Sequence, residues 1–199
     1  MHYTTSVFPA LGRMRRYHLD FRGVLGVFTA EECAAILAMG DAAGEFTRSE
    51  LFLPGDARHV RDSDLKWIEL GAANTWLFER IAGVAANLNR DYFDFDLDGA
   101  MRAFQLTRYR PNQHYSWHED LGSHELSRRK ITVSVQMSSP EDYDGGVLEF
   151  FHAEDNRAQA PTHQGSLVAF PSWMTHRVTP VTRGLRWSLV TWLEGPPFR

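Results

Sequence analysis

The sequence predicts an α+β fold in which helices in the first half of the chain precede an antiparallel β core in the second half. The chain has 199 residues, and 43% of them are hydrophobic. That length suits one domain, which buries roughly 70% of its unfolded surface. Before about residue 100 the apolar residues follow a helical period, and after it they alternate with polar residues. We therefore expect a single domain over 1–199, with a helical part at about 1–99 and a β core at about 100–194.

Two helices are predicted in the first half. Thr29 and Glu32 have the spacing of a capping box, which marks a helix start. The face of this helix that we expect to be buried contains Cys33, Ile36, Leu37 and Gly40. A second helix is predicted from about 73 to 89, and residues 62–70 are expected to form a shorter helical turn. The apolar face of the second helix contains Leu77, Ile81, Val84 and Leu88.

The second half of the chain is typical of short antiparallel strands. Apolar and polar side chains alternate over residues 131–137, which predicts a half-buried strand. Asp144-Gly145-Gly146 predicts a turn, followed by a strand at 147–151. Further strands are predicted at 166–170, 176–181 and 185–193. Five or six such strands predict a sandwich or barrel, with the helices packed on one face.

Charge and cysteine content exclude several classes of protein. The formal net charge is −4 and the isoelectric point is about 6.1, so no basic field of the kind that drives nucleic-acid binding is present. The single cysteine, Cys33, excludes an intrachain disulfide and is typical of a reducing compartment. No stretch approaches the roughly 20 apolar residues of a membrane span. Residues 1–16 carry charges without a following apolar segment, so we expect no secretory signal and a soluble, cytoplasmic protein.

His118-x-Asp120 is the first candidate for chemistry. In a strand, side chains at i and i+2 point to the same side, so this imidazole and carboxylate can bind one metal ion together. Two histidines and one carboxylate form the facial triad of non-haem Fe(II) oxygenases, and His176, in a later predicted strand, is the best candidate for the third ligand. The motif alone is weak, because His18-x-Asp20 also fits. We interpret that second copy as an incidental surface pair, because no comparable distal histidine follows it.

A candidate anion site follows in the last predicted strand. Arg186 and Ser188 stand two positions apart, so they share one face of that strand. A guanidinium and a hydroxyl on one face suit the distal carboxylate of a dicarboxylic cosubstrate.

Taken together, these features give a sequence that resembles the Fe(II)/2-oxoglutarate-dependent dioxygenases, and most of all their prolyl 4-hydroxylase-like branch. The resemblance covers about residues 100–194 and, more loosely, the helix from Thr29. Asn112 departs from the glycine that the family often has here, and asparagine also tolerates a left-handed turn. The collagen-type enzymes often have lysine where this chain has Arg186. The features that jointly carry the resemblance are Tyr109, Tyr115, His118-x-Asp120, Gly145-Gly146-x-Leu148-x-Phe150, Gly165, His176 and Arg186-x-Ser188.

The resemblance implies a fold and a set of ligands. The implied fold is a double-stranded β-helix, or jelly roll, with the N-terminal helices packed on one sheet. The implied cofactors are Fe(II), the cosubstrate 2-oxoglutarate and O2. The residues implied to bind Fe(II) are His118, Asp120 and His176. The residues implied to bind the far carboxylate of 2-oxoglutarate are Arg186, Tyr109 and Ser188.

The implied activity is hydroxylation of an unactivated C–H, with release of succinate and CO2. The expected substrate is a prolyl or similar residue in a peptide, or a free amino acid or small metabolite. Asp120 occupies the position that a halide would otherwise take, so the resemblance favours hydroxylation over halogenation. We expect no nucleic-acid or membrane partner, and the oligomeric state is left open.

Two alternative functions stay open. One is a nucleic-acid demethylase of the same superfamily. Against it stand the acidic isoelectric point and Trp192, because such enzymes carry a second arginine six residues after the one that matches Arg186. The other is a jelly-roll binding module without redox chemistry. Such a module has no reason to keep Arg186-x-Ser188 in phase with the triad.

The substrate pocket has no motif of its own. Trp117, Trp173 and Trp187 flank the ligand segments, and they could line a pocket or equally pack in the core. The composition of residues 44–64 makes them a candidate lid. The lid residues singled out are Phe46, Arg48, Phe52 and Arg58.

Other charged and imidazole side chains have plainer interpretations. The run Arg128-Arg129-Lys130 is interpreted as a solvated loop, although it could steer an anionic substrate. The histidines interpreted as surface residues are His114, His124 and His152.

Overall fold

The computed structural model describes residues 20–42, 44–49, 59–99, 103–151 and 157–198. Several of the sequence predictions therefore lie outside the described residues. They concern His18 of the second His-x-Asp pair, His152, and the lid residues Phe52 and Arg58.

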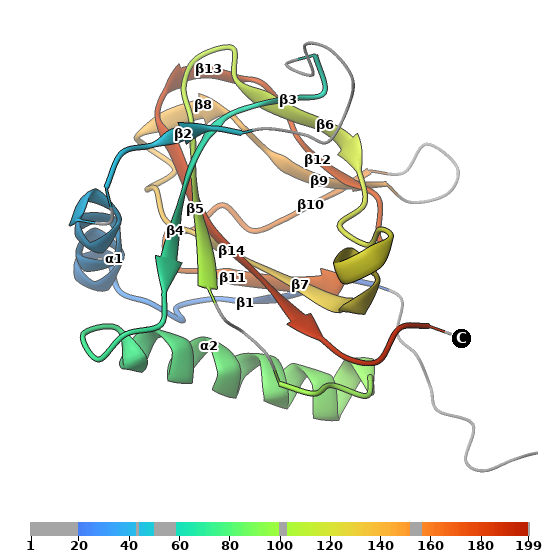
Figure 1. Cartoon of the computed structure of the whole chain (residues 1–199). Coiled ribbons are helices and arrows are strands. Elements are labelled where there is room, and N and C mark those ends of the chain that lie inside the picture. The colour runs from blue at the N-terminus through green and yellow to red at the C-terminus, as the bar shows by residue number, and fades with distance from the viewer. Residues whose placement is uncertain (1–19, 43, 50–58, 100–102, 152–156, 199) are drawn as a thin grey trace, which may run out of the picture.

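Two antiparallel sheets form the β core (Figure 1). The seven-stranded sheet contains, in spatial order, β1 (Arg22–Val24), β11 (Leu167–Pro171), β7 (Arg129–Gln136), β14 (Arg186–Glu194), β5 (Ala103–Tyr109), β4 (Asp64–Glu69) and β2 (Thr47–Arg48). The five-stranded sheet contains β10 (Arg157–Gln159), β9 (Leu148–Phe151), β12 (His176–Val178), β6 (His114–His118) and β3 (Arg61–Asp62). A two-stranded sheet pairs β13 (Val181–Gly184) with β8 (Tyr143–Gly145). This arrangement confirms the expected jelly roll.

The two predicted helices are present and lie on one side of the seven-stranded sheet (Figure 1). They are α1 (Ala30–Ala42) and α2 (Thr75–Leu88), and α2 continues into a π-helical turn, η2 (Asn89–Phe93). The capping box at the start of α1 is confirmed. The backbone N–H of Thr29 donates to Glu32 Oε2 over 3.0 Å, and the backbone N–H of Glu32 donates to Thr29 Oγ1 over 3.2 Å.

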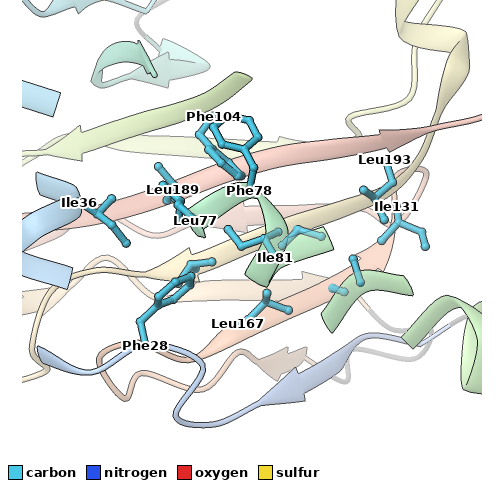
Figure 2. Packing of buried hydrophobic residues seen from close by; sticks show 14 of the residues in the cluster. Phe28, Ile36, Leu77, Phe78, Ile81, Phe104, Ile131, Leu167, Leu189 and Leu193 are labelled. Atoms are coloured by element: carbon cyan, nitrogen blue, oxygen red, sulfur yellow. The ribbon is translucent and has the colours of Figure 1, made fainter. Parts of the chain in front are cut away.

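The main hydrophobic core lies between these helices and the outer face of the seven-stranded sheet. Side chains from α1, α2 and the sheet meet there in one cluster (Figure 2). Among its fully buried members are Ile36, Leu77, Ile81, Leu167 and Leu189. A second cluster, which includes Phe150 and Phe170, lies between the two sheets. This cluster fills only part of the space between the sheets, because a cavity lies beside it. The cavity is available for a site.

The helical turn expected at 62–70 is wrong, because this segment forms β3 and β4. β4 pairs with β5 and alternates between buried and more exposed positions. Polar residues fill two of its buried positions, which hid the alternation. Lys66 donates to the carbonyl oxygen of Gly40 over 2.9 Å, and Asp64 accepts from Arg108 over 3.0 Å. The first half was expected to be largely helical, but four strands, β1 to β4, also lie before residue 100.

The strand predicted at 131–137 corresponds to β7, but it is not half-buried. Every residue of β7 after Arg129 is buried. Its apolar side chains face the helices, while Thr132 and Ser134 line the space between the two sheets. The polar face of this strand is therefore turned to an internal cavity and not to solvent.

Asn112 has the left-handed conformation expected for the turn between β5 and β6, with a φ of 72°. Within the described residues, no helix combines the length and apolar character that a membrane crossing needs.

Candidate active site

His118 and His176 lie side by side on neighbouring strands. β6 and β12 pair in antiparallel fashion, and these two histidines are Cα partners. The register shifts between this pair and the Val178–Tyr115 pair, as at a β-bulge. The shift lets Tyr115 and His118 both face the cavity, and their rings stack with centroids 3.4 Å apart.

Asp120 joins them from the segment that follows β6. The strand ends at His118, so the expectation that one strand face presents both residues is wrong in detail. Instead, the backbone N–H of Asp120 donates to the carbonyl oxygen of Ser172 over 2.9 Å, which fixes the turn. Asp120 Oδ1 then lies 3.8 Å from His118 Nε2, and Oδ2 lies 3.6 Å from His176 Nε2. The ligand atoms of the three residues all lie within 4.8 Å of one another.

Backbone carbonyls determine the tautomer of both histidines. His118 Nδ1 lies 2.8 Å from the carbonyl oxygen of Ser116, and His176 Nδ1 lies 2.8 Å from that of Met174. Because a carbonyl oxygen can only accept, each Nδ1 carries a hydrogen, and Nε2 is the nitrogen of each ring that faces Asp120 and can bind a metal. Burial and the neighbouring His176 lower the pKa of His118 to about 3. His118 is therefore neutral at physiological pH, which is the form that binds metals.

The carboxyl group of Asp120 is held ionised. Burial alone would raise its pKa, but the two imidazoles and a hydroxyl outweigh that effect and lower it. The hydroxyl belongs to Thr132, which donates to Asp120 Oδ2 over 2.7 Å and lies 3.1 Å from Ser172 Oγ. Two imidazoles and one ionised carboxylate are the donor set that Fe(II) oxygenases use, although the same set also binds other divalent transition metals.

Arg186, Tyr109 and Ser188 line the same cavity, which has a volume of about 530 Å³. Arg186 is only 4% exposed, and its Nε has no hydrogen-bond partner. Across the described ranges, no carboxylate lies within ion-pair distance of Arg186. Burying an unpaired guanidinium costs free energy, so this position fits an anionic group such as a carboxylate. Burial also raises the pKa of Tyr109, so its hydroxyl remains a hydrogen-bond donor.

Gly146 makes room for Arg186. Its φ is +57°, and a Cβ built on it would lie 2.8 Å from Arg186 Cδ and 2.9 Å from Val181 Cγ2. The glycine of the predicted turn is thus required both by the left-handed backbone and by the arginine packed beneath it.

Several cavity residues were missed as site residues, and five of them matter most for the chemistry of the cavity. Trp67 lies in the segment that was expected to form a helical turn, and Trp192 was considered only as evidence against a nucleic-acid demethylase. Their rings lie 6.3 Å apart. Thr132 lies on the strand face that was expected to meet solvent. Only Arg129 had a possible functional role in the sequence analysis, as part of a basic run that could steer an anionic substrate. The residues are Arg61, Trp67, Arg129, Thr132 and Trp192.

Several residues that were considered for the pocket lie elsewhere. Trp173 and Trp187 pack against the helix-side core, and Trp117 contacts Phe151, so none of the three lines the cavity. Phe46 packs against Trp187, with ring centroids 5.4 Å apart, on the helix side of the sheet.

The basic run is corrected, and the candidate lid is described only in part. Arg48 lies in β2 and lines the cavity as part of the sheet, while residues 50–58 lie outside the described residues. The basic run is not a solvated loop, because Lys130 is buried, Arg129 begins β7, and Arg128 pairs with Asp98.

The surface interpretation of His114 and His124 agrees with the structure in part. His124 is exposed. His114 is half-buried, and its Nε2 lies 3.2 Å from the carbonyl oxygen of His59.

Comparison with known proteins identifies the family. A family model described as the 2OG-Fe(II) oxygenase superfamily matches residues 104–194. A PKHD-type hydroxylase of Synechococcus sp. (strain JA-2-3B'a(2-13)) is 38% identical over 173 residues, which cover 84% of this chain and 75% of the relative. The chain belongs to the PKHD-type hydroxylases of the 2OG-Fe(II) oxygenase superfamily. Enzymes of this superfamily are oxidoreductases that use Fe(II), 2-oxoglutarate and O2, so the resemblance seen in the sequence is confirmed.

Solved structures support the fold of this PKHD-type hydroxylase. A prolyl 4-hydroxylase of Pseudomonas putida has a TM-score of 0.71 and 20% identity, covering 88% of this chain and 92% of that one. A prolyl hydroxylase from Trichoplax adhaerens, solved in complex with a hypoxia inducible factor peptide fragment, has a TM-score of 0.73 and 16% identity. The latter match covers 88% of this chain and 84% of that one. At these identities the likeness shows the shared fold alone.

Proposed function

We propose that this PKHD-type hydroxylase binds Fe(II) through His118, Asp120 and His176 and hydroxylates an unactivated C–H. The substrate is a prolyl or similar residue in a peptide, or a free amino acid or small metabolite, and the reaction releases succinate and CO2. The observation that carries the proposal is that three metal-ligating atoms within 4.8 Å of one another share a cavity with a buried, unpaired arginine. The whole chain acts as a single dioxygenase domain.

Each part of the site has one role in this proposal. The bound iron supplies the activation of O2. Asp120 and the two imidazoles would hold it, and in the facial triad of Fe(II) oxygenases such a ligand set is completed by the cosubstrate and O2. The carbonyls of Ser116 and Met174 orient the imidazoles, and Thr132 orients the carboxylate.

The cosubstrate is held at the other end of the cavity. Arg186 pairs with the far carboxylate of 2-oxoglutarate, and the hydroxyls of Tyr109 and Ser188 donate hydrogen bonds to it. Because Arg186 lies in β14 and is buried, it would hold the cosubstrate at a constant distance from the metal.

An anaerobic titration tests the proposal. Metal-free protein is titrated with Fe(II) and then with 2-oxoglutarate, and the visible absorption is followed. We expect a metal-to-ligand charge-transfer band that His176→Ala abolishes. A folded protein without the band would overturn the proposal and would favour a binding module.

A matched variant shows whether the loss of any histidine from this strand would abolish the band. His114 lies on the same strand as His118, but its Nε2 lies 3.2 Å from the carbonyl oxygen of His59 and it does not line the cavity. His114→Ala should keep the band. Release of succinate, measured with peptides and with free amino acids, then separates the substrate classes.

A further inference from the structure

Four arginines line the cavity, and they differ in how their charges are balanced. Arg48 forms ion pairs with Asp62 and Asp64. Arg186 faces the position proposed for the cosubstrate. The remaining two, Arg61 and Arg129, form no ion pair with any carboxylate in the part of the chain that the structure describes.

Arg61 and Arg129 enter the cavity from opposite sheets. Arg61 lies on β3, its guanidinium is 4.7 Å from the centre of the Tyr115 ring, and its Nε donates to Ser63 Oγ over 3.1 Å. Arg129 begins β7, and its guanidinium lies 3.7 Å from the centre of the Trp192 ring. One of its terminal nitrogens also donates to the carbonyl oxygen of Asp120 over 3.3 Å. Aromatic rings and neutral oxygens therefore hold both guanidiniums in place without neutralising them.

The charges of Arg61 and Arg129 would not be balanced when iron and cosubstrate are bound. In the proposed complex, the charges of Fe(II) and Arg186 balance Asp120 and the two carboxylates of 2-oxoglutarate. Glu119 is the other acidic residue that lines the cavity, but it is exposed and accepts a hydrogen bond from Thr175. Two partly buried cations that repel each other across one cavity are stabilised by an anion bound between them.

We propose that Arg61 and Arg129 form a second anion-binding subsite, which binds a carboxylate of the substrate. This inference rests on the proposed function, because it assumes that Arg186 is occupied by the cosubstrate. The carboxylate belongs to a small amino-acid derivative or to an acidic side chain beside the target residue of a peptide. Both sources present the same planar group to the two guanidiniums.

Matched probes measure whether the subsite binds a carboxylate. Protein is loaded anaerobically with Mn(II) and saturating 2-oxoglutarate, and the binding of each probe is measured by calorimetry. The small probes are N-acetyl-L-proline and its neutral amide. The peptide probes are acetyl-Asp-Pro-Gly-amide and acetyl-Asn-Pro-Gly-amide. We expect one of the two acids to bind at least about tenfold more tightly than its neutral partner, and the pair that shows it identifies the source of the carboxylate.

Two arginine substitutions make the test specific. Arg61→Gln should reduce the preference for the acid to about twofold or less. Arg48→Gln is the matched control, because it removes a cavity arginine whose charge is already paired, and it should keep the preference. Arg129→Gln removes the other charge from the opposite sheet and should act like Arg61→Gln. Arg61→Lys, which retains a charge, should keep most of the preference.

The outcomes separate this proposal from the one on which it rests. The Fe(II)/2-oxoglutarate band is measured on the wild type and on each variant as a check that the metal site is assembled. If the wild type shows the band but neither acid is preferred, the subsite proposal is wrong and the proposed function stands. If the preference survives both Arg61→Gln and Arg129→Gln, the subsite is also wrongly placed. If the wild type shows no band, the proposed function itself fails.

Discussion

The two faces of the seven-stranded sheet are made by the same strands and have opposite properties. On β7, Val133 and Val135 face the helices and join the main hydrophobic core, while Thr132 and Ser134 face the other sheet and line the cavity. β14 repeats this division, with Leu189 on the helix side and Ser188 on the cavity side. On β7 both faces are buried, yet only the helix-side face is apolar, whereas the cavity side of β14 also carries Val190 and Trp192.

The difference shows how the jelly roll separates stability from chemistry. The helix-side face is closed by packing and holds the fold together through buried apolar area. The cavity-side face keeps hydroxyls, an amide and a guanidinium away from bulk water, where electrostatic interactions are stronger. Substitutions on one strand should therefore have separable effects, according to the face that they change.

The largest expected effect is on the cavity side. Arg186→Met should weaken the binding of 2-oxoglutarate by about 3 kcal/mol or more, which is a hundredfold or greater loss of affinity, because it leaves a carboxylate without its partner. The metal-free protein should be as stable as the wild type or more stable, since a buried unpaired charge is replaced by an apolar side chain. Calorimetric titration of the cosubstrate and urea unfolding measure the two effects. Unchanged cosubstrate affinity would remove Arg186 from the site.

Leu189, three residues after Arg186 on the same strand, faces the helices. Its substitution should reduce stability and leave cosubstrate binding unchanged. Leu189 is 1% exposed and belongs to the main core, so Leu189→Ala should reduce the free energy of unfolding by about 2–5 kcal/mol. The affinity of the folded protein for 2-oxoglutarate should change by less than about twofold. Urea unfolding and the same titration check both parts. A large loss of cosubstrate affinity in folded Leu189→Ala would show that the two faces are not separable.

The sequence predicted the parts of the molecule in which local pattern and final environment agree. The capping box at Thr29 and the helices that follow depend on contacts within a few residues, so short-range spacing was enough. The His-x-Asp motif, the distant histidine and the arginine of the last strand were correctly grouped by resemblance to a family, and the structure places them around one cavity. That family is confirmed, while the role of each residue stays a prediction.

The predictions failed where the surroundings of a polar residue are formed by distant parts of the chain. Alternation of polar and apolar residues cannot distinguish a strand face that meets solvent from one that meets an internal cavity, so β7 was expected to be half-buried. Buried Asp64 and Lys66 concealed β4, because their partners lie on other elements. Arg61 and Arg129 come together only through the pairing of β3 with β6 and of β7 with β14, which no local spacing reveals.

A smaller effect on the cavity side comes from a residue that does not bind the metal directly. Thr132 donates to Asp120 Oδ2 over 2.7 Å, so Thr132→Val removes this hydrogen bond at nearly constant volume. We expect Fe(II) affinity to fall by about ten- to a hundredfold, as is typical when a group that orients a metal ligand is lost. Competition with a chelator measures the affinity. Val133→Ala, one position along on the other face, serves as the control and should leave Fe(II) affinity unchanged while reducing stability.

The smallest expected effect comes from the N-terminal cap of α1, which lies in the helix layer and does not line the cavity. Thr29 Oγ1 accepts the backbone N–H of Glu32 at the start of α1, and Thr29→Ala should reduce the free energy of unfolding by about 1 kcal/mol. Thr29→Ser keeps the hydroxyl and should restore most of that loss. Both variants should bind Fe(II) and 2-oxoglutarate like the wild type, because α1 packs on the outer face of the sheet (Figure 1). If Thr29→Ala weakened either ligand more than about threefold, the helix layer would influence the geometry of the cavity through the sheet, and the division between the two faces would not hold.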